Sequence, residues 1–167
     1  MPNTNPSIAD LCGTMKTRFL CDRKYVPPTL EQVASAESQL DLKFPRDYIR
    51  YLHESAAIRT PFQVLKVSPN NGTESPTHDI VDNTLWRRAR ATKPLPKQYI
   101  IFRCLGERGD YHAFDSSQRY GDQDATDYAV VRIEFTKTGI DVEPVAPNFR
   151  TWLESMVKKH CQPDQNA

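Results

Sequence analysis

The sequence predicts an α+β domain: helices first, then an antiparallel sheet, then one packing helix. Three observations support this prediction. Apolar residues recur at helical spacing through the N-terminal half, segments between residues 99 and 145 alternate or carry strand-forming residues, and an apolar helical stripe follows from residue 148. At 167 residues the chain fits one domain with a sizeable core.

The first element is a predicted helix over residues 7–20. Ile8, Leu11, Cys12, Met15 and Phe19 would lie on one side of it. A Val-Pro-Pro segment ending at Pro28 then separates this helix from the next. We therefore assign residues 1–27 to an N-terminal helical extension.

A second helix is predicted to begin after Thr29, where Gln32 completes a capping box. Its apolar face would comprise Leu30, Val33, Ala34 and Leu40, with Glu37 and Gln39 away from it. Pro45 would open a third helix at its first position, and the two helices are expected to form a hairpin. The apolar stripe of the third helix would contain Tyr48, Ile49, Tyr51 and Leu52.

The middle of the chain mixes element types. Residues 62–67 are rich in β-branched and aromatic side chains and are predicted as a strand. Residues 68–78 read as a loop with an Asn71-Gly72 turn, and Asp79 is predicted to cap a helix over residues 79–91.

The C-terminal half predicts four strand segments and a helix. Strands are expected over residues 99–104, 111–114, 128–135 and 140–145, and a helix over residues 148–159. The helical hairpin and this last helix should cover one face of the sheet, which leaves the other face partly exposed. Tyr48, Leu52, Phe149 and Trp152 are predicted to be core residues.

Three motifs in register resemble the SUKH superfamily of Smi/Knr-like proteins. The first is Leu42, Phe44, Pro45, Asp47, Tyr48, Tyr51 and Leu52; the second is Tyr99–Phe102 with Gly109-Asp110-Tyr111 and Phe114-Asp115; the third is Ala146–Phe149 with Trp152-Leu153. The chain departs from the family at Ser55-Ala56-Ala57, where an Asn-Gly is common, and at Asn148, where Ser is usual. The resemblance implies a SUKH-like domain over residues 28–160 and a flexible tail over residues 161–167.

Composition excludes several classes of function. The net charge of +1 gives no global field that would attract nucleic acid or an anionic membrane. No apolar run approaches the length of a membrane span, and the first residues lack a secretory signal, so we expect a cytoplasmic protein. The four cysteines lack zinc-site spacing and are expected to be free thiols, with no metal and no cofactor.

The chain carries no nucleotide-binding, hydrolase or metalloprotease motif. His112 near Asp110 and Asp115 would be the candidate for a general acid–base site. The simpler interpretation is a strand residue that points to solvent. We therefore expect a protein that is not an enzyme.

Residues 86–97 carry five basic side chains and no acid: Arg87, Arg88, Arg90, Lys93 and Lys97. One interpretation is a nucleic-acid or anion contact with Trp86 as a stacking platform. The alternative, favoured by the near-neutral net charge, is a helix with Trp86 in the core and solvated arginines.

Residues 107–127 form the opposite cluster, with six acids against two arginines, a local balance of −4. A calcium site fits poorly, because the EF-hand glycine and final glutamate are missing. A solvated acidic edge and a protein-binding surface remain open, since tyrosines interleave with the acids. The candidate partner-binding residues are Asp110, Tyr111, Asp115, Tyr120, Asp122, Asp124 and Asp127.

Many SUKH-like proteins are bacterial immunity proteins. The resemblance therefore implies a protein that binds a cognate toxin domain, in some cases a nuclease, and blocks its active site or substrate approach. Alternatives are an intracellular regulatory scaffold of the Smi/Knr kind, or a nucleic-acid or anion-binding module that uses residues 87–97. The expected partner is a protein, with neither nucleic acid nor membrane bound.

Overall fold

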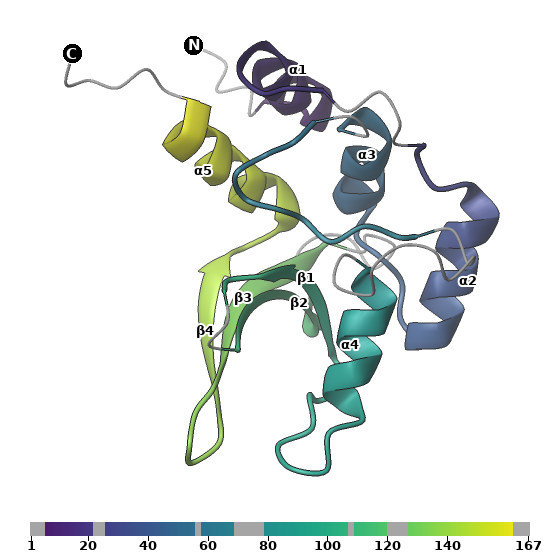
Figure 1. Ribbon diagram of the computed structural model, residues 1–167, viewed down its shortest axis with the longest axis vertical. Coiled ribbons are helices and arrows are strands. Elements are labelled where there is room, and N and C mark those ends of the chain that lie inside the picture. Colours follow the sequence, from purple (N-terminus) through teal and green to yellow (C-terminus); the bar gives the residue numbers. More distant parts are fainter. Residues whose placement is uncertain are drawn as a thin grey trace.

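A computed structural model of the chain describes residues 6–21, 26–55, 58–68, 79–106, 109–119 and 127–161, without the side chain of Arg119. Its elements in order are α1 (Ile8–Arg18), α2 (Leu30–Leu40), α3 (Arg46–Glu54), α4 (Ile80–Arg88), β1 (Tyr99–Cys104), β2 (Asp110–Arg119), β3 (Tyr128–Phe135), β4 (Ile140–Ala146) and α5 (Phe149–Cys161). The strands form one antiparallel sheet in the order β1-β2-β3-β4 (Figure 1). The predicted α+β fold class is confirmed.

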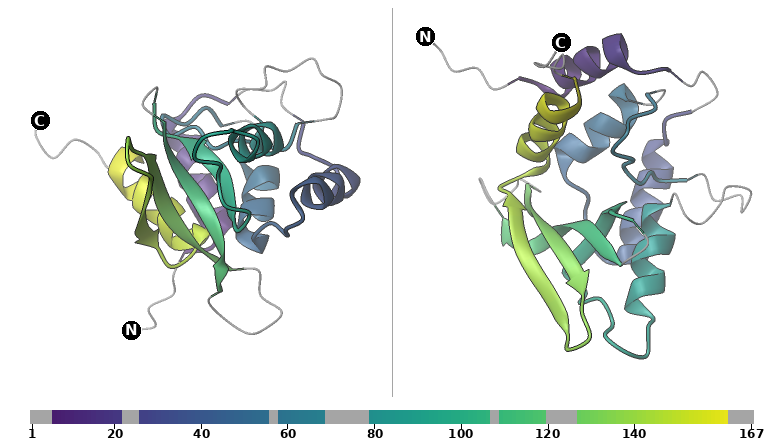
Figure 2. Two further views of the ribbon diagram at one scale, coloured as in Figure 1. Left: turned by 90° about the horizontal axis from the view of Figure 1, so that it is seen from below. Right: turned by 60° about the vertical axis from the view of Figure 1, so that its left-hand side comes forward.

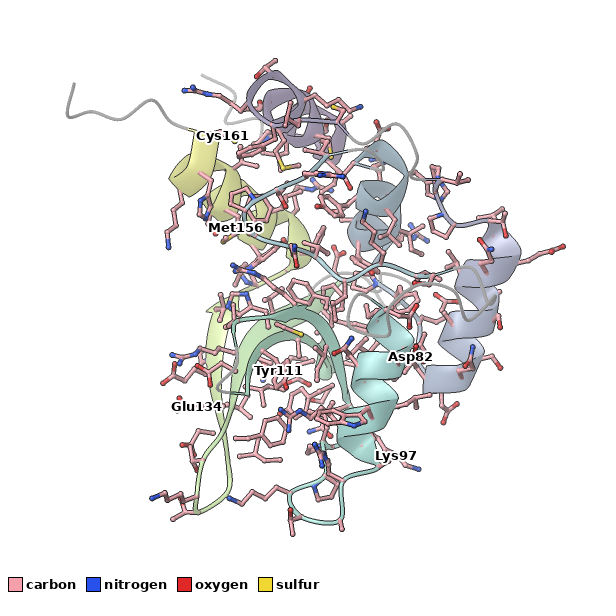
Figure 3. The ribbon with its side chains drawn as sticks, in the orientation of Figure 1. Asp82, Lys97, Tyr111, Glu134, Met156 and Cys161 are labelled. Carbon is pink, nitrogen blue, oxygen red and sulfur yellow. The ribbon has the colours of Figure 1, made fainter. Side chains whose placement is uncertain are left out.

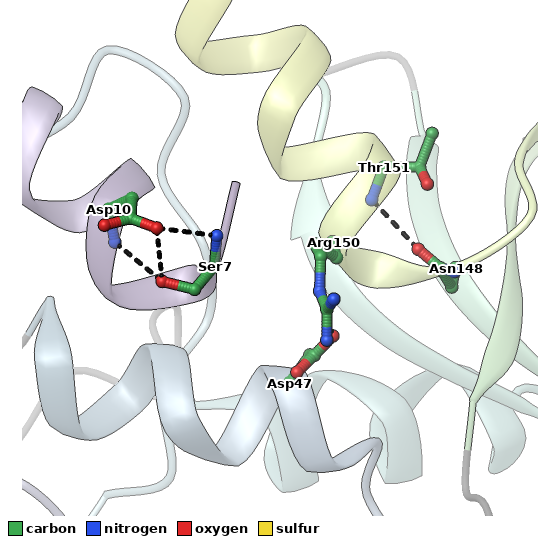
Figure 4. Close-up of polar contacts among 6 residues, drawn as sticks. All are labelled: Ser7, Asp10, Asp47, Asn148, Arg150 and Thr151. Atoms are coloured by element: carbon green, nitrogen blue, oxygen red, sulfur yellow. Dashed lines mark hydrogen bonds and ion pairs between the residues drawn. The ribbon is translucent and has the colours of Figure 1, made fainter. Parts of the chain in front are cut away.

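Side-chain caps begin most of the helices where the sequence predicted them. Ser7 and Asp10 form a capping box at α1 (Figure 4), and Thr29 and Gln32 form another at α2. Asp79 accepts hydrogen bonds from the first backbone N–H groups of α4. Asn148 accepts from the backbone N–H of Thr151, so Asn in place of the usual Ser still caps α5.

The prediction that α2 and α3 pack together as a hairpin is wrong. Helix α2 packs against α4, whereas α3 packs against α1 and α5. The tight corner between α2 and α3 sends the two helices into different layers, and α3 begins at Arg46, one residue after Pro45.

The buried face of α2 also differs from its apolar pattern. Leu30 is 77% exposed, whereas Glu37 is only 8% exposed. Glu37 accepts a hydrogen bond from the backbone N–H of Phe44 at 2.9 Å and pairs with Lys43 at 2.7 Å. A carboxylate is tolerated there because it stabilises the corner and meets a cation.

Helices cover both faces of the sheet, which corrects the prediction of helices on one face only. Figure 2 shows α5 on one side of the sheet and α4 on the other. The side chain of Thr84 in α4 accepts a hydrogen bond from the backbone N–H of Ile101 in β1. The part left open lies on the α5 face, beyond the helix and toward the β3–β4 turn.

An aromatic cluster fills the space between the sheet, α3 and α5. Phe102 and Phe114 stack with ring centroids 4.3 Å apart, and Phe149 meets Tyr48 and Phe114 edge-on. Trp152 packs on Phe102 at 4.9 Å. The predicted core residues Tyr48, Leu52, Phe149 and Trp152 are all buried, so those predictions are confirmed.

Residues 62–67 are not a strand of the sheet. Leu65 donates its backbone N–H to Phe102, its carbonyl accepts from the Tyr48 hydroxyl at 2.6 Å, and Lys66 makes a single bridge with Asp79. The buried side chains Phe62, Val64, Leu65 and Val67 explain the apolar pattern that predicted a strand.

Helix α1 shares this core rather than standing apart from it. Ile8, Leu11, Cys12 and Met15 are buried against α3 and α5. Arg18 donates from Nε to the carbonyl of Cys161 at 3.1 Å, which joins the first helix to the last. Residues 1–27, assigned above to an extension, thus contain a helix of the domain itself.

Candidate protein-binding surface

The structure distributes the predicted partner-binding residues over different environments. Asp110 lies on the sheet surface, Tyr111 and Asp115 are buried, and Asp127 is half-buried. Tyr120, Asp122 and Asp124 lie outside the described residues.

Tyr111 belongs to the face of the sheet that α4 covers. Figure 3 shows it between the sheet and α4, and its hydroxyl accepts a hydrogen bond from Arg87 Nε at 2.8 Å. The guanidinium of Arg87 also lies over the rings of Tyr111 and Phe135. Tyr111 is therefore a packing residue of this layer.

Asp115 lies on the same face as Tyr111 and is 2% exposed. Its carboxylate accepts hydrogen bonds from the backbone N–H and the hydroxyl of Ser117, at 3.0 and 2.6 Å. In this arrangement Asp115 holds the β2 backbone at Ser117 and contributes no exposed charge.

Asp127 directly precedes β3, at the end of the sheet away from Asp110, and lies near the first turns of α3 and α5. Burial raises the pKa of its carboxyl, and the charge of Asp47 raises it further, against the opposing effect of Arg150 and Arg46. Asp47 itself pairs with Arg150 at 2.9 Å (Figure 4). Asp127 is thus far along the sheet from Asp110.

An acidic cluster forms instead across three strands, with three exposed side chains and a mostly covered Asp110. Asp110 in β2 lies opposite Glu134 in β3, and Glu134 lies opposite Asp141 in β4. Glu143, two residues further along β4, lies opposite Arg132 on the same face of the sheet. Glu134 and Glu143 side chains are 49% and 70% exposed. Glu134 points away from the α4 layer (Figure 3). We call Asp110, Glu134, Asp141 and Glu143 the acidic cluster.

Arg132 lies within this cluster and only partly neutralises it. Its guanidinium contacts Asp110 at 2.8 Å, Glu134 at 3.4 Å and Glu143 at 3.7 Å. The hydrogen bond with Asp110, and then the charges around it, raise the pKa of Arg132. Four carboxylates against one guanidinium leave a local excess of negative charge.

Sequence reasoning missed Glu134, Asp141 and Glu143 because it followed a contiguous stretch of chain. The signal was present in the alternation of β3, which placed Glu134 and Arg132 opposite the apolar face. Cross-strand register then decides which acids become neighbours.

Arg103 and His112 lie beside the acidic cluster on the same sheet face. Arg103, His112 and Arg132 occupy facing positions on β1, β2 and β3. Trp152 Nε1 donates to His112 Nδ1 at 3.1 Å, and Arg103 Nη1 approaches the same atom at 3.5 Å. His112 therefore packs under α5, which corrects the expectation of a side chain in solvent.

Residues 86–97, the basic segment, differ from the favoured prediction of a buried Trp86 with solvated arginines. Trp86 is 51% exposed, while Arg87 and Arg88 are half-buried. Arg88 donates to the carbonyls of Leu40, Lys97 and Tyr99, and Lys93 donates to the carbonyl of Thr136. These contacts give Arg87, Arg88 and Lys93 structural roles.

The structure does not bring together the acid–base candidates that the sequence suggested. His112 and Asp115 lie on opposite faces of β2, and Asp110 is paired with Arg132. Across the described residues there is no group of three His, Cys, Asp or Glu side chains able to hold a metal ion. In the same part of the chain, every helix is too short or too polar to cross a bilayer.

Comparison with known proteins agrees with the fold. A solved structure described as a protein from Pseudomonas syringae pv. tomato matches with a TM-score of 0.57 at 14% identity, covering 86% of this chain and 93% of that one. At this identity the likeness supports the fold alone. No curated protein matches the sequence.

The family comparison reaches further. The profile SUKH_5, described as SMI1-KNR4 cell-wall, matches residues 10–158, from within α1 into α5. This range includes all three motifs noted in the sequence. Because the match spans most of the chain, the protein belongs to the SMI1-KNR4 family of the SUKH superfamily.

Proposed function

We propose that this protein is an immunity protein, which binds a cognate bacterial toxin domain and blocks its active site or the approach of its substrate. The observation that carries the proposal is the acidic cluster, a group of carboxylates on the open part of the sheet. Surface carboxylates attract a basic partner and accelerate its encounter. A nuclease toxin is one such partner, because it is basic where it meets phosphate.

Several features support binding rather than chemistry. The acidic cluster lies on regular strands, whose positions are fixed by the ladder and by the aromatic core beneath α5. A rigid surface loses little conformational entropy when a partner docks. The edge strand β4 carries Pro144, Asp141 and Glu143, which discourage strand pairing, so side chains are expected to make the contact.

The experiment is co-expression of the toxin domain encoded beside this gene, with survival and co-purification as readouts. An Asp141→Lys/Glu143→Lys variant should lose rescue and complex formation, because two attractive charges become repulsive. Glu31→Lys/Asp82→Lys is the matched control, since it reverses two exposed acids on helices and also changes the net charge from +1 to +5. Asp122→Lys/Asp124→Lys tests the remaining predicted acids.

The outcomes separate the candidates. Rescue by the wild-type protein and the control, but not by the sheet variant, supports immunity through the acidic cluster. Absence of rescue and complex with a toxin proven active would overturn the proposal for that pair. The family description, SMI1-KNR4 cell-wall, then favours the second candidate, a regulatory protein-binding scaffold.

A further inference from the structure

Arg103 is a half-buried cation on β1. Among the described residues no acid lies within ion-pair distance of its guanidinium. Its contacts there are weak acceptors: His112 Nδ1 at 3.5 Å and the Met156 sulfur at 3.9 Å. Burial lowers the pKa of this guanidinium.

His112 adds a second donor at the same place. Its Nδ1 accepts from Trp152, so the proton of the neutral ring is on Nε2. Nε2 has no hydrogen-bond partner within the described part of the chain. Burial, then the charges of Arg103 and Arg132, lower the pKa of His112 to about 4, so the ring is neutral at pH 7.

The surroundings favour an anion. Trp152 and Met156 of α5 lie beside Arg103, whose guanidinium is 5.9 Å from the centre of the Trp152 ring and approaches the Met156 sulfur at 3.9 Å. His160, on the same helix, has its pKa lowered by burial and by the charges of Lys159 and Arg103. Among the described residues, the acids of this sheet face gather around Arg132, and none of them pairs with Arg103.

We propose that Arg103 and His112 form a carboxylate-binding site, occupied by an Asp or Glu side chain of the partner protein. A partly desolvated guanidinium is destabilised until a negative group pairs with it, and its planar donors match a carboxylate. Arg103 on β1 and His112 on β2 occupy facing positions beside Trp152 of α5, so a carboxylate that pairs with Arg103 would lie next to the indole.

The position of the carboxylate-binding site indicates that its occupant belongs to the partner protein. Arg103 and His112 share a sheet face with the acidic cluster, separated from it by Arg132. A partner that places basic residues on the acidic cluster would bring an acid of its own surface to Arg103. This inference rests on the proposed function. It adds that the docking surface of the partner carries basic residues, which meet the acidic cluster, and an acidic residue, which meets Arg103.

Two tryptophans make the site measurable without the partner. The indole N–H of Trp152 binds His112, whereas Trp86 lies on α4 and serves as the internal reference. Titration with N-acetyl-glutamate α-amide should shift the Trp152 indole signal in NMR spectra saturably, in the millimolar range. N-acetyl-glutamine amide is the neutral control, and inorganic phosphate is the competing anion.

Saturation by the glutamate compound alone, lost in Arg103→Gln and retained in Arg132→Gln, supports the carboxylate site. Equal shifts at Trp86, no saturation, or tighter binding of phosphate would each overturn it. With the toxin domain, Arg103→Gln should weaken the complex about tenfold to a hundredfold. If Asp141→Lys/Glu143→Lys weakens that complex and Arg103→Gln does not, this site is refuted while the proposed function stands.

Discussion

His112 illustrates how much a single residue depends on its neighbours. In sequence it lies between acids, Asp110 and Asp115, which suggested acid–base chemistry. In the fold it faces Arg103, Arg132 and the indole of Trp152, all of which are cations or donors. The structure thus makes His112 a neutral acceptor with a depressed pKa, rather than a proton shuttle at pH 7.

This depressed pKa predicts an acid-sensitive contribution to stability. The unfolded ring takes up a proton near pH 6.5, whereas the folded ring does so only near pH 4, so stability falls as the pH falls through this window. Between pH 7.5 and 5 the loss should be about 1 kcal/mol after allowance for solvent screening.

Urea unfolding at the two pH values measures this loss. His112→Gln, which keeps an acceptor but has no titrating ring, should reduce the pH dependence by that amount. His53→Gln is the control, because His53 is exposed on α3. Identical pH dependence in wild type and His112→Gln would contradict the prediction.

Arg88 acts at the scale of elements, since it fastens α4 to its neighbours. Its guanidinium reaches the carbonyl of Leu40 at the end of α2, of Lys97 in the loop and of Tyr99 at the start of β1. Burial lowers the pKa of Arg88, because a charged guanidinium is disfavoured away from water, and the three carbonyl acceptors offset part of that cost. A lysine ammonium is a point donor and cannot span the same three acceptors.

Arg88→Lys should therefore lower the free energy of unfolding by about 1–3 kcal/mol, the cost of leaving buried polar groups without partners. Arg90→Lys is the matched control two residues away, since Arg90 is exposed and stacks on Trp86. Chemical denaturation compares the two variants. Equal stability would show that the Arg88 contacts are dispensable.

At the scale of the whole molecule, α1 and α5 close the domain at the end opposite the β3–β4 turn (Figure 1). Deletion of residues 1–21 removes four buried side chains and the Arg18 contact with Cys161. Each buried apolar side chain contributes about 1.5–3 kcal/mol, so the loss should exceed about 5 kcal/mol and unfold most of the protein.

Circular dichroism and urea unfolding measure the effect of the deletion. Deletion of residues 162–167, which the sequence predicts to be part of a flexible tail, is the control, and it should leave the transition unchanged. A truncated protein with the wild-type transition would show that α1 is a separable extension after all.

Local patterns predicted the elements well. The caps at Thr29 and Asp79 and the strand alternation of residues 128–135 depend on neighbours a few positions apart, and a sequence displays those directly. The buried segment around Leu65 was mistaken for a strand because burial selects the same residue types as a strand does.

The sequence by itself determined the fold class, the family and most helices and strands, because hydrophobic periodicity and capping act over short distances along the chain. Only the tertiary structure decided which charges meet. Strand register placed Asp110, Glu134 and Asp141 side by side, buried Asp115, and left Arg103 without a carboxylate among the described residues. Electrostatic partnerships depend on distance and burial between residues far apart in sequence, and these exist only once the sheet and α5 have packed.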